Sequence, residues 1–585
     1  MLSSPYMASL EEKRHTLAHL LAAAVLERYP HAKSTIGPAV DNGFYYDFDF
    51  SGGDAPKEAD LPELEGVMHE LLSSWSTMHG TEVSEADARD RFAGNPFKLE
   101  IIDGVVKAGE PITLYTAGDF TDLCRGGHSE SPSKDIPTDS FKLERIAGAY
   151  WRGDEKNPML TRIYGLAFET KDELVAYETQ MEEAKKRDHK KLGKELDLFV
   201  FSELVGPGLP LFTPKGTQVR NLLDEFVWEL RKPRGYEKVE IPHITKKELY
   251  QTSGHWDKFK DELFRIKTRE GHEFAMKPMN CPHHTQIYAR KQWSYRELPQ
   301  RYSSTTACYR DEQSGELSGL SRVRAFWQDD AHVFCRMSDV KVEFLKVWDI
   351  IHSFYGAFGF DLQVRFSTHD PEHPENYLGE PSVWAKTEGM LADIIKEKQV
   401  DALPGVGEAA FYGPKLDFIA KDSIGRSWQV ATIQLDMSQP ESFDLTCINE
   451  EGQKERIVMI HAAIMGSIER FLSILIEHTA GAFPVWLSPI QARVVPVSDK
   501  HGDYASEIVE ALKAAGIRAD ADLANESLGK KIRAAKGEKI PYVLVVGDAE
   551  VEAKTLSVES REEKVGALSV ADFIERITTE TKNRS

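Results

Sequence analysis

The sequence contains few cysteines and lacks a membrane-like apolar segment. Its five cysteines are an odd, scattered set among 585 residues, which argues against a disulfide framework and indicates a reducing compartment. The longest apolar stretch, 457–477, carries His461, Glu469 and Arg470, so it predicts a buried strand and helix instead of a membrane span. Residues 1–13 lack the apolar core of a secretory signal. We therefore expect a cytoplasmic protein without a membrane partner.

Internal repeats, low-complexity segments and an excess of positive charge are also lacking. Acidic residues outnumber basic ones by 94 to 72, which gives a net charge of −22. Net charge governs solubility and long-range steering, so it does not exclude a local basic surface for nucleic acid. The segments 185–191 and 530–533 are basic, but each alone is better explained as a solvated helix face. Composition leaves the partner undecided.

Local patterns divide the chain into several domains, and its length predicts three or four. A helix begins after Ser9, whose spacing to Glu12 is that of a capping box, and 43–50 alternates as a strand does. The charged helical run 171–194 lacks an apolar stripe and suits a connector. A strong amphipathic helix covers 219–230, and the last hundred residues follow a βαβ pattern.

The segment 321–332 has an unusually polar face. In a strand, alternate side chains point to the same face. One parity here collects Arg322, Arg324, Phe326, Gln328, Asp330 and His332. Arg310 and Glu312 share a face upstream, and a Ser/Gly-rich loop predicts an antiparallel hairpin. Arginines beside an aromatic ring suit a nucleotide, although a solvated sheet face with cross-strand salt bridges explains the pattern equally well.

Several segments resemble the class II aminoacyl-tRNA synthetases, in the same order along the chain. Residues 222–242 resemble the helix and strand of motif 1, residues 309–326 resemble motif 2, and residues 466–470 resemble motif 3. More narrowly, five segments are similar to the threonyl-tRNA synthetase family: 276–282, 328–332, 411–415, 428–436 and 458–461.

The resemblance implies a multidomain α+β and α/β fold. A class II antiparallel-sheet catalytic core is expected at 196–485, preceded by an α+β editing domain at 1–168. A helical linker at 169–195 would join them, and an α/β anticodon-binding domain would occupy 486–585. The small ubiquitin-like domain that opens most bacterial relatives is expected to be absent. Motif 1 implies a homodimer.

The resemblance also implies an ATP-dependent ligase that activates L-threonine as threonyl-adenylate and transfers it to tRNA(Thr). Arg310 would hold the α-phosphate and the threonine carboxylate, Glu312 the adenine amino group and Arg322 the terminal phosphates. Phe326 and Arg470 would sandwich the adenine, and Mg²⁺ would bridge the phosphates. The expected catalytic residues are Arg310, Lys415 and Arg470, while Gln429 and Ser467 complete the ATP-binding set.

Cys281, His332 and His461 lie far apart in sequence, and each alone is explained as a buried core residue. The resemblance places them around one catalytic Zn²⁺ per subunit, with positions left open for substrate. An apolar pocket separates threonine from isosteric valine by only ~100-fold, whereas a metal gives valine no hydroxyl to coordinate. The expected threonine-binding residues are Met279, Gln328, Asp330, Tyr412 and Gln434. Gln429 and Gln434 have opposite parity, so both face the site only if their strand bulges.

A second, hydrolytic site is expected because serine lacks only one methyl group, worth ~1–3 kcal/mol of discrimination. His15 and His19 are four apart on one helix face, and Cys124 and His128 form a second pair. Ligand types alone indicate another zinc site. The resemblance to the editing domain shared by threonyl and alanyl enzymes implies instead a metal-free pocket that cleaves seryl-tRNA with water. Lys98 and Asp122 complete the expected set.

The C-terminal segment matches the family less closely. Asn525 and Glu550 lie where the family contacts anticodon bases, but Glu559 stands where many relatives have arginine-rich sequence. His283 and Ser318 also replace residues more usual in relatives. Three other interpretations are an RNA-binding or amino-acid-sensing paralogue, a prolyl or seryl enzyme, and a stand-alone editing hydrolase. The intact ATP-binding and zinc-binding sets argue against all three.

Overall fold

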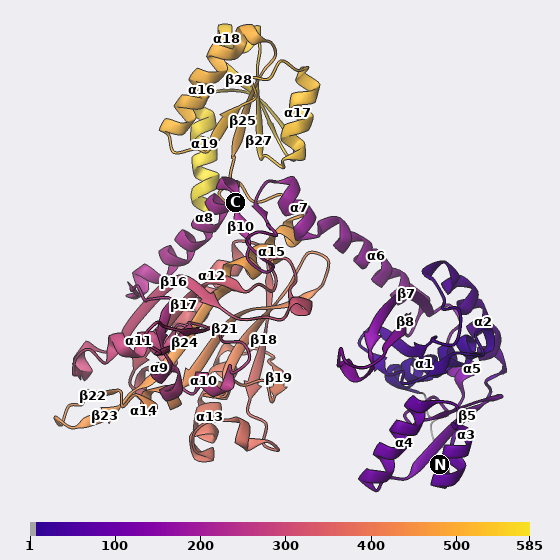
Figure 1. Cartoon of the computed structure of the whole chain (residues 1–585). Coiled ribbons are helices and arrows are strands. Elements are labelled where there is room, and N and C mark those ends of the chain that lie inside the picture. Colours follow the sequence, from indigo (N-terminus) through magenta and orange to yellow (C-terminus); the bar gives the residue numbers. More distant parts are fainter. Residues whose placement is uncertain (1–7, 585) are drawn as a thin grey trace. The chain divides into compact units, whose positions relative to one another are not determined.

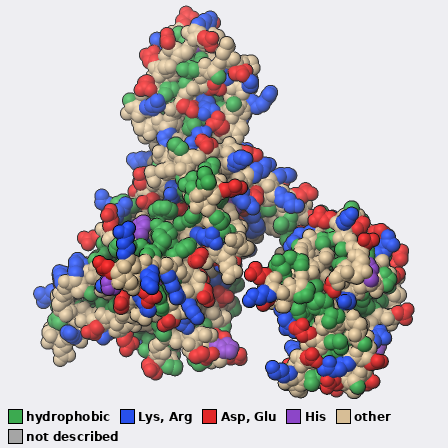
Figure 2. Space-filling view, in the orientation of Figure 1, with side chains coloured by type: hydrophobic (Ala, Val, Ile, Leu, Met, Phe, Trp, Pro, Cys, Tyr) green, Lys and Arg blue, Asp and Glu red, His purple; other side chains and the backbone are tan. Residues whose placement is uncertain are grey.

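A computed structural model describes residues 8–584 in two compact units, whose elements are labelled in Figure 1. The first unit is Met1–Glu182 and the second is Glu183–Ser585. The boundary falls inside α6 (Lys171–Arg187), the charged helix expected as a connector, and α7 (His189–Glu195) follows it. On the face drawn in Figure 2, acidic and basic side chains are interspersed in both units. Within residues 8–584, the helices are all too short or too polar to cross a membrane.

The first unit packs a long buried helix against a sheet. Helix α1 (Leu10–Arg28) begins with the expected capping box, in which Ser9 and Glu12 exchange hydrogen bonds. All ten residues from 16 to 25 are buried, because one side of the helix meets β3 (Gly43–Asp49) and another meets further helices. A helix buried all round carries apolar residues all round, and the apolar residues of α1 accordingly do not form a single stripe.

Two antiparallel sheets complete this unit, with the orders β1-β3-β8-β7 and β4-β5-β6, and β2 pairs with β3. Their other strands are β1 (Lys33–Ser34), β2 (Ala39–Val40), β4 (His79–Val83), β5 (Ile112–Ala117), β6 (Phe120–Leu123), β7 (Phe141–Tyr150) and β8 (Met159–Ala167). The helices are α2 (Leu61–Ser74), α3 (Glu85–Arg91), α4 (Pro96–Ala108) and α5 (Pro132–Asp135).

The second unit is built on an eight-stranded sheet of order β11-β16-β17-β24-β21-β20-β18-β19. The two outermost pairs are parallel and the other pairs are antiparallel. The strands are β11 (Glu237–Lys238), β16 (Gln300–Tyr309), β17 (Ala325–Cys335), β18 (Asp361–Thr368), β19 (Leu403–Val406), β20 (Lys415–Lys421), β21 (Ser427–Asp436) and β24 (Val458–Ser467).

One face of this sheet packs against α8 (Pro214–Arg231), α12 (Val340–Gly356) and α15 (Ile468–Thr479). Side chains of one parity, such as Ala331, Ile433 and Ile460, join the core beneath these helices. Because successive side chains alternate faces, the other parity is left on the opposite face, and that parity carries the polar residues of the predicted site.

Smaller elements surround this sheet. Three short sheets contain β9 (Phe199–Val200) with β10 (Leu211–Phe212), β12 (Ile244–Lys246) with β14 (Glu273–Met276) and β13 (Arg265–Lys267), and β15 (Trp293–Ser294) with β22 (Thr446–Ile448) and β23 (Lys454–Arg456). The remaining helices are α9 (Lys247–Thr252), α10 (His255–Lys258), α11 (Cys281–Tyr288), α13 (Pro381–Lys398) and α14 (Ser438–Ser442).

The predicted antiparallel hairpin is confirmed, but its strands are shorter than expected. β16 and β17 pair from Gln300↔Phe334 to Tyr309↔Ala325. The expectation that Arg322 and Arg324 lie on the strand was wrong, because the Arg324 N–H donates to the carbonyl of Gly208 at 2.8 Å instead of extending the ladder. Both arginines therefore belong to the loop between the strands.

The C-terminal residues form the expected small α/β sheet, with the order β26-β25-β27-β28-β29. Parallel pairing joins the first three strands, and antiparallel pairing joins the last three. In Figure 1, α16 and α19 lie on one side of the sheet and α17 on the other. The elements are β25 (Ala492–Pro496), α16 (Gly502–Ala514), β26 (Ala519–Ala521), α17 (Leu528–Gly537), β27 (Tyr542–Val546), α18 (Asp548–Ala553), β28 (Thr555–Ser560), β29 (Lys564–Ser569) and α19 (Val570–Asn583).

Candidate functional site

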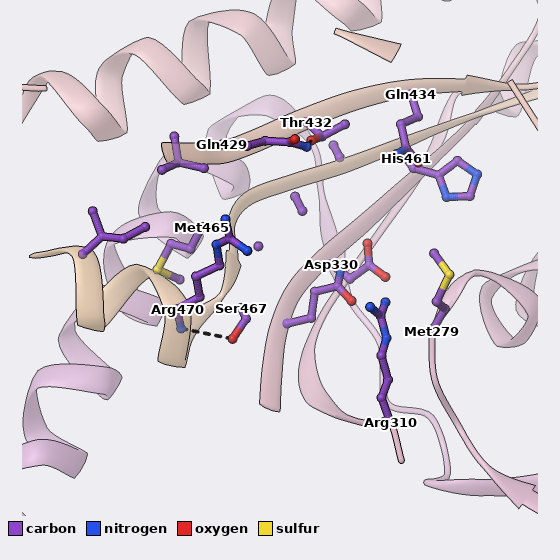
Figure 3. A pocket seen from close by; sticks show the side chains of 16 residues that line it. Met279, Arg310, Asp330, Gln429, Thr432, Gln434, His461, Met465, Ser467 and Arg470 are labelled. Carbon is purple, nitrogen blue, oxygen red and sulfur yellow. Dashed lines mark hydrogen bonds between the residues drawn. The ribbon is translucent and has the colours of Figure 1, made fainter. Parts of the chain in front are cut away.

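The polar face of the eight-stranded sheet lines a cavity of about 360 Å³. Figure 3 shows Asp330, Gln434 and His461 around it, from three neighbouring strands, with Arg310 and Arg470 nearby. Nine of the residues expected from the sequence line this cavity: Met279, Arg310, Gln328, Asp330, Gln429, Gln434, His461, Ser467 and Arg470. The strand alternation thus gathers residues that are up to 191 positions apart in the sequence.

A bulge in β21 brings both glutamines to the cavity. Phe418 of β20 pairs with Ala431, whereas the next residue, Ile419, pairs with Gln429. Val430 is therefore an extra residue, and it reverses the parity of the strand. The sequence allowed both glutamines to face the site only if their strand bulged. The bulge is present, and Gln429 and Gln434 line the same cavity.

A second irregularity shapes the end of β24. Gln328 pairs with Ser467 and Asp330 with Ala463, so three residues of β24 stand opposite one residue, Asp329. The buried Asp329 carboxylate accepts the backbone N–H groups of residues 464 and 465, each at 2.9 Å. Arg231 of α8 donates to the same carboxylate at 3.2 Å, and burial raises the pKa of Asp329 to about 7. No pattern in the sequence indicates this support.

Cys281, His332 and His461 form a fully buried cluster, and their ligand atoms all lie within 4.8 Å of one another. His332 Nε2 and His461 Nδ1 face each other at 3.1 Å, close to the separation of two nitrogens bound to one tetrahedral Zn²⁺ at ~2.0–2.1 Å. Burial lowers the pKa of His332 and raises that of Cys281. A Cys/His/His donor set at this spacing fits a zinc ion.

Outer residues orient both histidines. His461 Nε2 lies 2.9 Å from Asp436 Oδ2, and His332 Nδ1 lies 2.8 Å from His284 Nδ1. A ligating histidine commonly donates its other ring N–H to a carboxylate, which fixes the tautomer. Asp436 is part of a segment that carried the resemblance, but neither it nor His284 was predicted as a site residue, because sequence spacing gives no indication of these contacts.

The cavity also carries a buried carboxylate, Asp330, near the Cys/His/His cluster. Asp330 accepts from Asn280 Nδ2 at 3.1 Å, and Asn280 Oδ1 accepts from Lys277 Nζ at 2.7 Å. Burial raises the pKa of Asp330 and lowers that of Lys277. Tyr412 stacks on His461 with ring centroids 4.9 Å apart, and its hydroxyl donates to Gln434 Oε1 at 2.5 Å. Asn280 and Lys277 were missed as site residues.

A second cavity, of about 420 Å³, adjoins the first and shares Arg310, Gln328, Ser467 and Arg470 with it. Phe326 also lines it, with the Arg310 guanidinium 5.4 Å from the ring centroid. Arg322 donates to the nearly buried Glu312 carboxylate at 2.6–2.8 Å. In this state the two residues expected to contact adenine and phosphate contact each other.

Lys415 and Gln429 converge on a fully buried carboxylate, Asp417. Lys415 Nζ and Gln429 Nε2 lie 2.7 and 2.8 Å from its oxygens. Arg365 donates to Asp417 at 3.2 Å and to Gln429 Oε1 at 2.7 Å. Asp417 and Arg365 were not predicted, since their roles depend on the pairing of β18, β20 and β21.

The first unit holds a second cluster, made of His15, His19, Cys124 and His128, whose ligand atoms also lie within 4.8 Å of one another. Burial disfavours the Cys124 thiolate, but hydrogen bonds from His128, His15 and His19 lower its pKa to about 3. Burial lowers the pKa of His128 to about 4. Cys124 also lines a mainly apolar cavity of about 410 Å³. The predicted juxtaposition of the two residue pairs is present.

Lys98 and Asp122 form a buried ion pair beside this cluster, with 2.5 Å between Nζ and Oδ1. His19 Nδ1 lies 3.2 Å from Asp122 Oδ2. Burial opposes the charge on His19, yet the contact with Asp122 raises its pKa to about 9. Tyr46 joins the group by donating to Asp122 at 2.5 Å and accepting from Lys98 at 3.0 Å. Tyr46 was expected only as part of the alternating strand 43–50, and that pattern does not indicate a role in the site.

The two anticodon residues expected from the sequence lie outside the strands of the C-terminal sheet, Asn525 in the loop between β26 and α17 and Glu550 in α18. Asn525 is exposed. Glu550 is half-buried and accepts the Gly547 N–H at 2.9 Å at the start of α18. Glu559 pairs with Lys536 at 2.7 Å.

Three family models match the chain in the expected order. The model described as the threonyl and alanyl tRNA synthetase second additional domain matches 112–164. The tRNA synthetase class II core domain (G, H, P, S and T) matches 264–479. The anticodon binding domain matches 491–580.

Individual relatives extend these matches over nearly the whole chain. A threonine–tRNA ligase from Acetivibrio thermocellus is 47% identical over 98% of this chain and 88% of its own length. One from Rubrobacter xylanophilus is 46% identical over 98% and 89%. The crystal structure of the RNA binding domain of threonyl-tRNA synthetase from Cryptosporidium parvum is similar at a TM-score of 0.65 and 35% identity, covering 67% of this chain and 98% of that one. With a class II core, an editing-type domain and an anticodon-binding domain in one chain, the protein belongs to the threonine–tRNA ligase family of class II aminoacyl-tRNA synthetases.

Proposed function

We propose that the chain activates L-threonine with ATP and Mg²⁺ and transfers it to tRNA(Thr). The observation that carries this proposal is the pair of adjoining cavities on the polar sheet face. One is lined by His461 of the Cys/His/His cluster, and the other is lined by arginines and an aromatic ring. We assign 196–485 to this reaction, 1–168 to editing, 169–195 to the linker and 486–585 to anticodon binding.

The proposed reaction would take place where the two cavities meet, at the residues that line both of them. Attack of the threonine carboxylate on the α-phosphate needs charge neutralisation and alignment more than a protein nucleophile. Arg310, which lines both cavities, would hold the carboxylate and the α-phosphate together.

The other residues would bind the nucleotide. Arg470 and Phe326 would enclose the adenine, and Ser467 would line its site. Lys415 and Gln429, which both contact Asp417, would bind the phosphates. Glu312 and Arg322 would separate to bind the adenine and the terminal phosphates.

Zinc is the metal we propose for the buried cluster. Cys281, His332 and His461 would hold it, and when bound it would supply a Lewis-acidic site for the amino and hydroxyl groups of threonine. Asp330 would accept the ammonium hydrogens from the opposite side. Gln328, Tyr412 and Gln434 would close the pocket around the methyl group, with Met279 at its edge. Valine would find no hydroxyl ligand there.

The cluster of the first unit is proposed to hydrolyse seryl-tRNA without a metal. The ion pairs of Asp122 with Lys98 and His19 keep the pocket charged. The low pKa of His128 leaves its ring neutral at pH 7, so that it can accept a proton from water. His15 and Cys124 would orient that water. Contacts to the anticodon bases would come from Asn525 and Glu550 in the C-terminal α/β domain.

A homodimer in the cytoplasm is also proposed. Segment 200–211 exposes five large apolar side chains close to α8, which is the motif 1 helix: Val200, Phe201, Leu204, Val205 and Leu211. Contiguous exposed apolar surface of this kind commonly marks a protein interface. Light scattering after gel filtration should give the mass of two chains.

Amino-acid-dependent exchange of pyrophosphate into ATP tests the central proposal. On zinc-loaded protein, threonine should support strong exchange, serine weaker exchange, and valine none, since valine lacks the hydroxyl. Proline is the control for the alternative that the chain is a prolyl enzyme. Absence of exchange with every amino acid, in protein shown to contain zinc, would reject the proposed function.

A further inference from the structure

A buried histidine at the start of α7 contacts the loop that carries Arg322, one of the proposed ATP-binding residues. His189 is 4% exposed. Its ring Nε2 lies 3.0 Å from the backbone nitrogen of Leu320. A backbone N–H can only donate, so Nε2 is the acceptor and the ring proton belongs to Nδ1. Nδ1 in turn lies 2.6 Å from Glu477 Oε1 on α15.

The contact is fixed from the histidine side. The backbone N–H of His189 donates to the same Glu477 oxygen at 3.1 Å, and Arg426 donates to the other oxygen at 2.6 Å. The carboxylate is thus held in place on both oxygens. It selects the ring tautomer that leaves Nε2 free to accept the Leu320 amide.

The contact is also fixed from the loop side. Gly319 has a φ of 50°, and a Cβ at this position would lie 2.2 Å from His189 Nε2, so the close approach requires glycine. The Leu320 side chain is fully buried in the core. Ser321 Oγ lies 2.9 Å from Ser473 Oγ of α15. Three successive residues therefore hold this turn against α7, the core and α15.

The turn lies directly before Arg322, which lines the proposed nucleotide cavity. Ser318 and Arg322 form an isolated bridge across it, and Arg322 lines the cavity of about 420 Å³. His189 lines neither this cavity nor the adjoining one. Its ring can affect a nucleotide only through the loop.

We propose that His189 is a positioning residue for ATP, which fixes the loop 314–324 by accepting the Leu320 amide and so places Arg322 for the phosphates. This inference rests on the proposed ATP-dependent activation. It assigns to α7, at the end of the proposed linker, an indirect part in shaping the nucleotide site.

Hydrogen–deuterium exchange of the ligand-free chain tests the contact itself. His189→Ala should speed exchange of a peptide covering 314–324 by about threefold to tenfold, the equivalent of one lost hydrogen bond. His189→Gln should restore slow exchange, because its amide can accept from Leu320 and donate to Glu477. His478→Ala is the matched control, since that ring bonds the carbonyl of Phe358 at 3.1 Å. It should leave this peptide unchanged.

Steady-state pyrophosphate exchange tests the consequence. His189→Ala should raise the KM for ATP by about threefold to tenfold, with the KM for threonine unchanged and His189→Gln close to wild type. Equal changes in both KM values, failure of the glutamine variant, or a metal ion lost with His189 would overturn the inference. Wild-type protein without exchange activity would instead reject the proposed function, while the deuterium result would still report the contact.

Discussion

Two clusters of histidine and cysteine, one in each unit, place their ligand atoms within 4.8 Å of one another. In the Cys281/His332/His461 cluster, the proposed catalytic zinc site, all three side chains are buried, and burial raises the pKa of Cys281. In the cluster of the first unit, the proposed editing pocket, two of the four side chains are partly exposed, and hydrogen bonds from three histidines lower the pKa of Cys124 to about 3. Similar ligand types thus occur in opposite electrostatic settings.

This difference shows that the residues around a set of ligands influence metal binding as much as the ligands themselves do. The catalytic cluster has an outer carboxylate, Asp436, on the ring nitrogen that faces away from the other ligands, as metal sites commonly do. In the editing pocket the carboxylate, Asp122, is engaged by Lys98, Tyr46 and His19. A cation beside the cluster disfavours a metal ion, so the two clusters are predicted to differ in metal content.

The largest expected effect is on threonine activation. Cys281→Ala should reduce threonine-dependent exchange by at least ~100-fold, since even outer residues of metal sites contribute ~10–100-fold. Hydrolysis of seryl-tRNA should be unchanged in the same protein. His15→Ala is the reciprocal variant, and it should spare exchange and reduce hydrolysis. If both variants impaired both reactions, the two clusters would not be separate sites.

Breaking the buried ion pair of the editing pocket should be the next largest effect. Lys98→Met leaves Asp122 buried without its strongest partner, which typically costs ~3–5 kcal/mol. We expect the first unit to unfold at a lower temperature in calorimetry, with the threonine exchange of folded protein retained. Combining Lys98→Met with Asp122→Asn should recover part of the loss. A single variant as stable as wild type would show that the pair contributes nothing.

The next expected effect concerns the outer carboxylate, Asp436. Asp436→Asn should weaken zinc binding by ~10–100-fold, because the His461 ring loses its charged acceptor. Metal analysis against a graded chelator measures this directly. The wild-type chain should contain one zinc ion. Two ions, with the second lost in Cys124→Ala, would show that the editing pocket also binds metal.

The smallest expected effect is the pH dependence of Cys124 alkylation. A thiolate is the reactive form, and a group whose pKa is lowered to about 3 stays ionised as the pH falls from 8 to 5. Its rate with iodoacetamide should therefore change less than about twofold over that range. An ordinary thiol with a pKa of ~8.5 would slow by several hundredfold or more. A similar decline at Cys124 would contradict the proposed charge state.

The ionisation of Cys124 also makes the stability of the fold depend on pH. Because its pKa is lowered by folding, the Cys124 thiolate contributes stability that is fully present only above the unfolded pKa of ~8.5 and is lost as the pH falls through about 3. His19 behaves oppositely. Its pKa is raised to about 9, so its contribution is present below ~6.5 and is lost as the pH rises through about 9.

The periodic parts of the fold were predictable, because local spacing fixes which side chains share a face. The capping box at Ser9, the strand at 43–50 and the β16–β17 hairpin were found in this way. The extents of the strands were not, since Arg322 and Arg324 leave the ladder only where the loop meets Gly208. The bulge at Val430 could be stated only as a condition, because it depends on the register with β20.

The sequence by itself determined the family, the domain order and the residue types of both sites, because these are written in ordered short motifs. The tertiary structure alone decided which carboxylate serves which ligand, and which buried groups support them. Asp329, Asp417 and His284 act through contacts whose partners lie as far as 136 residues away in the sequence. Such contacts follow from strand register and helix packing, and no spacing along the chain encodes them.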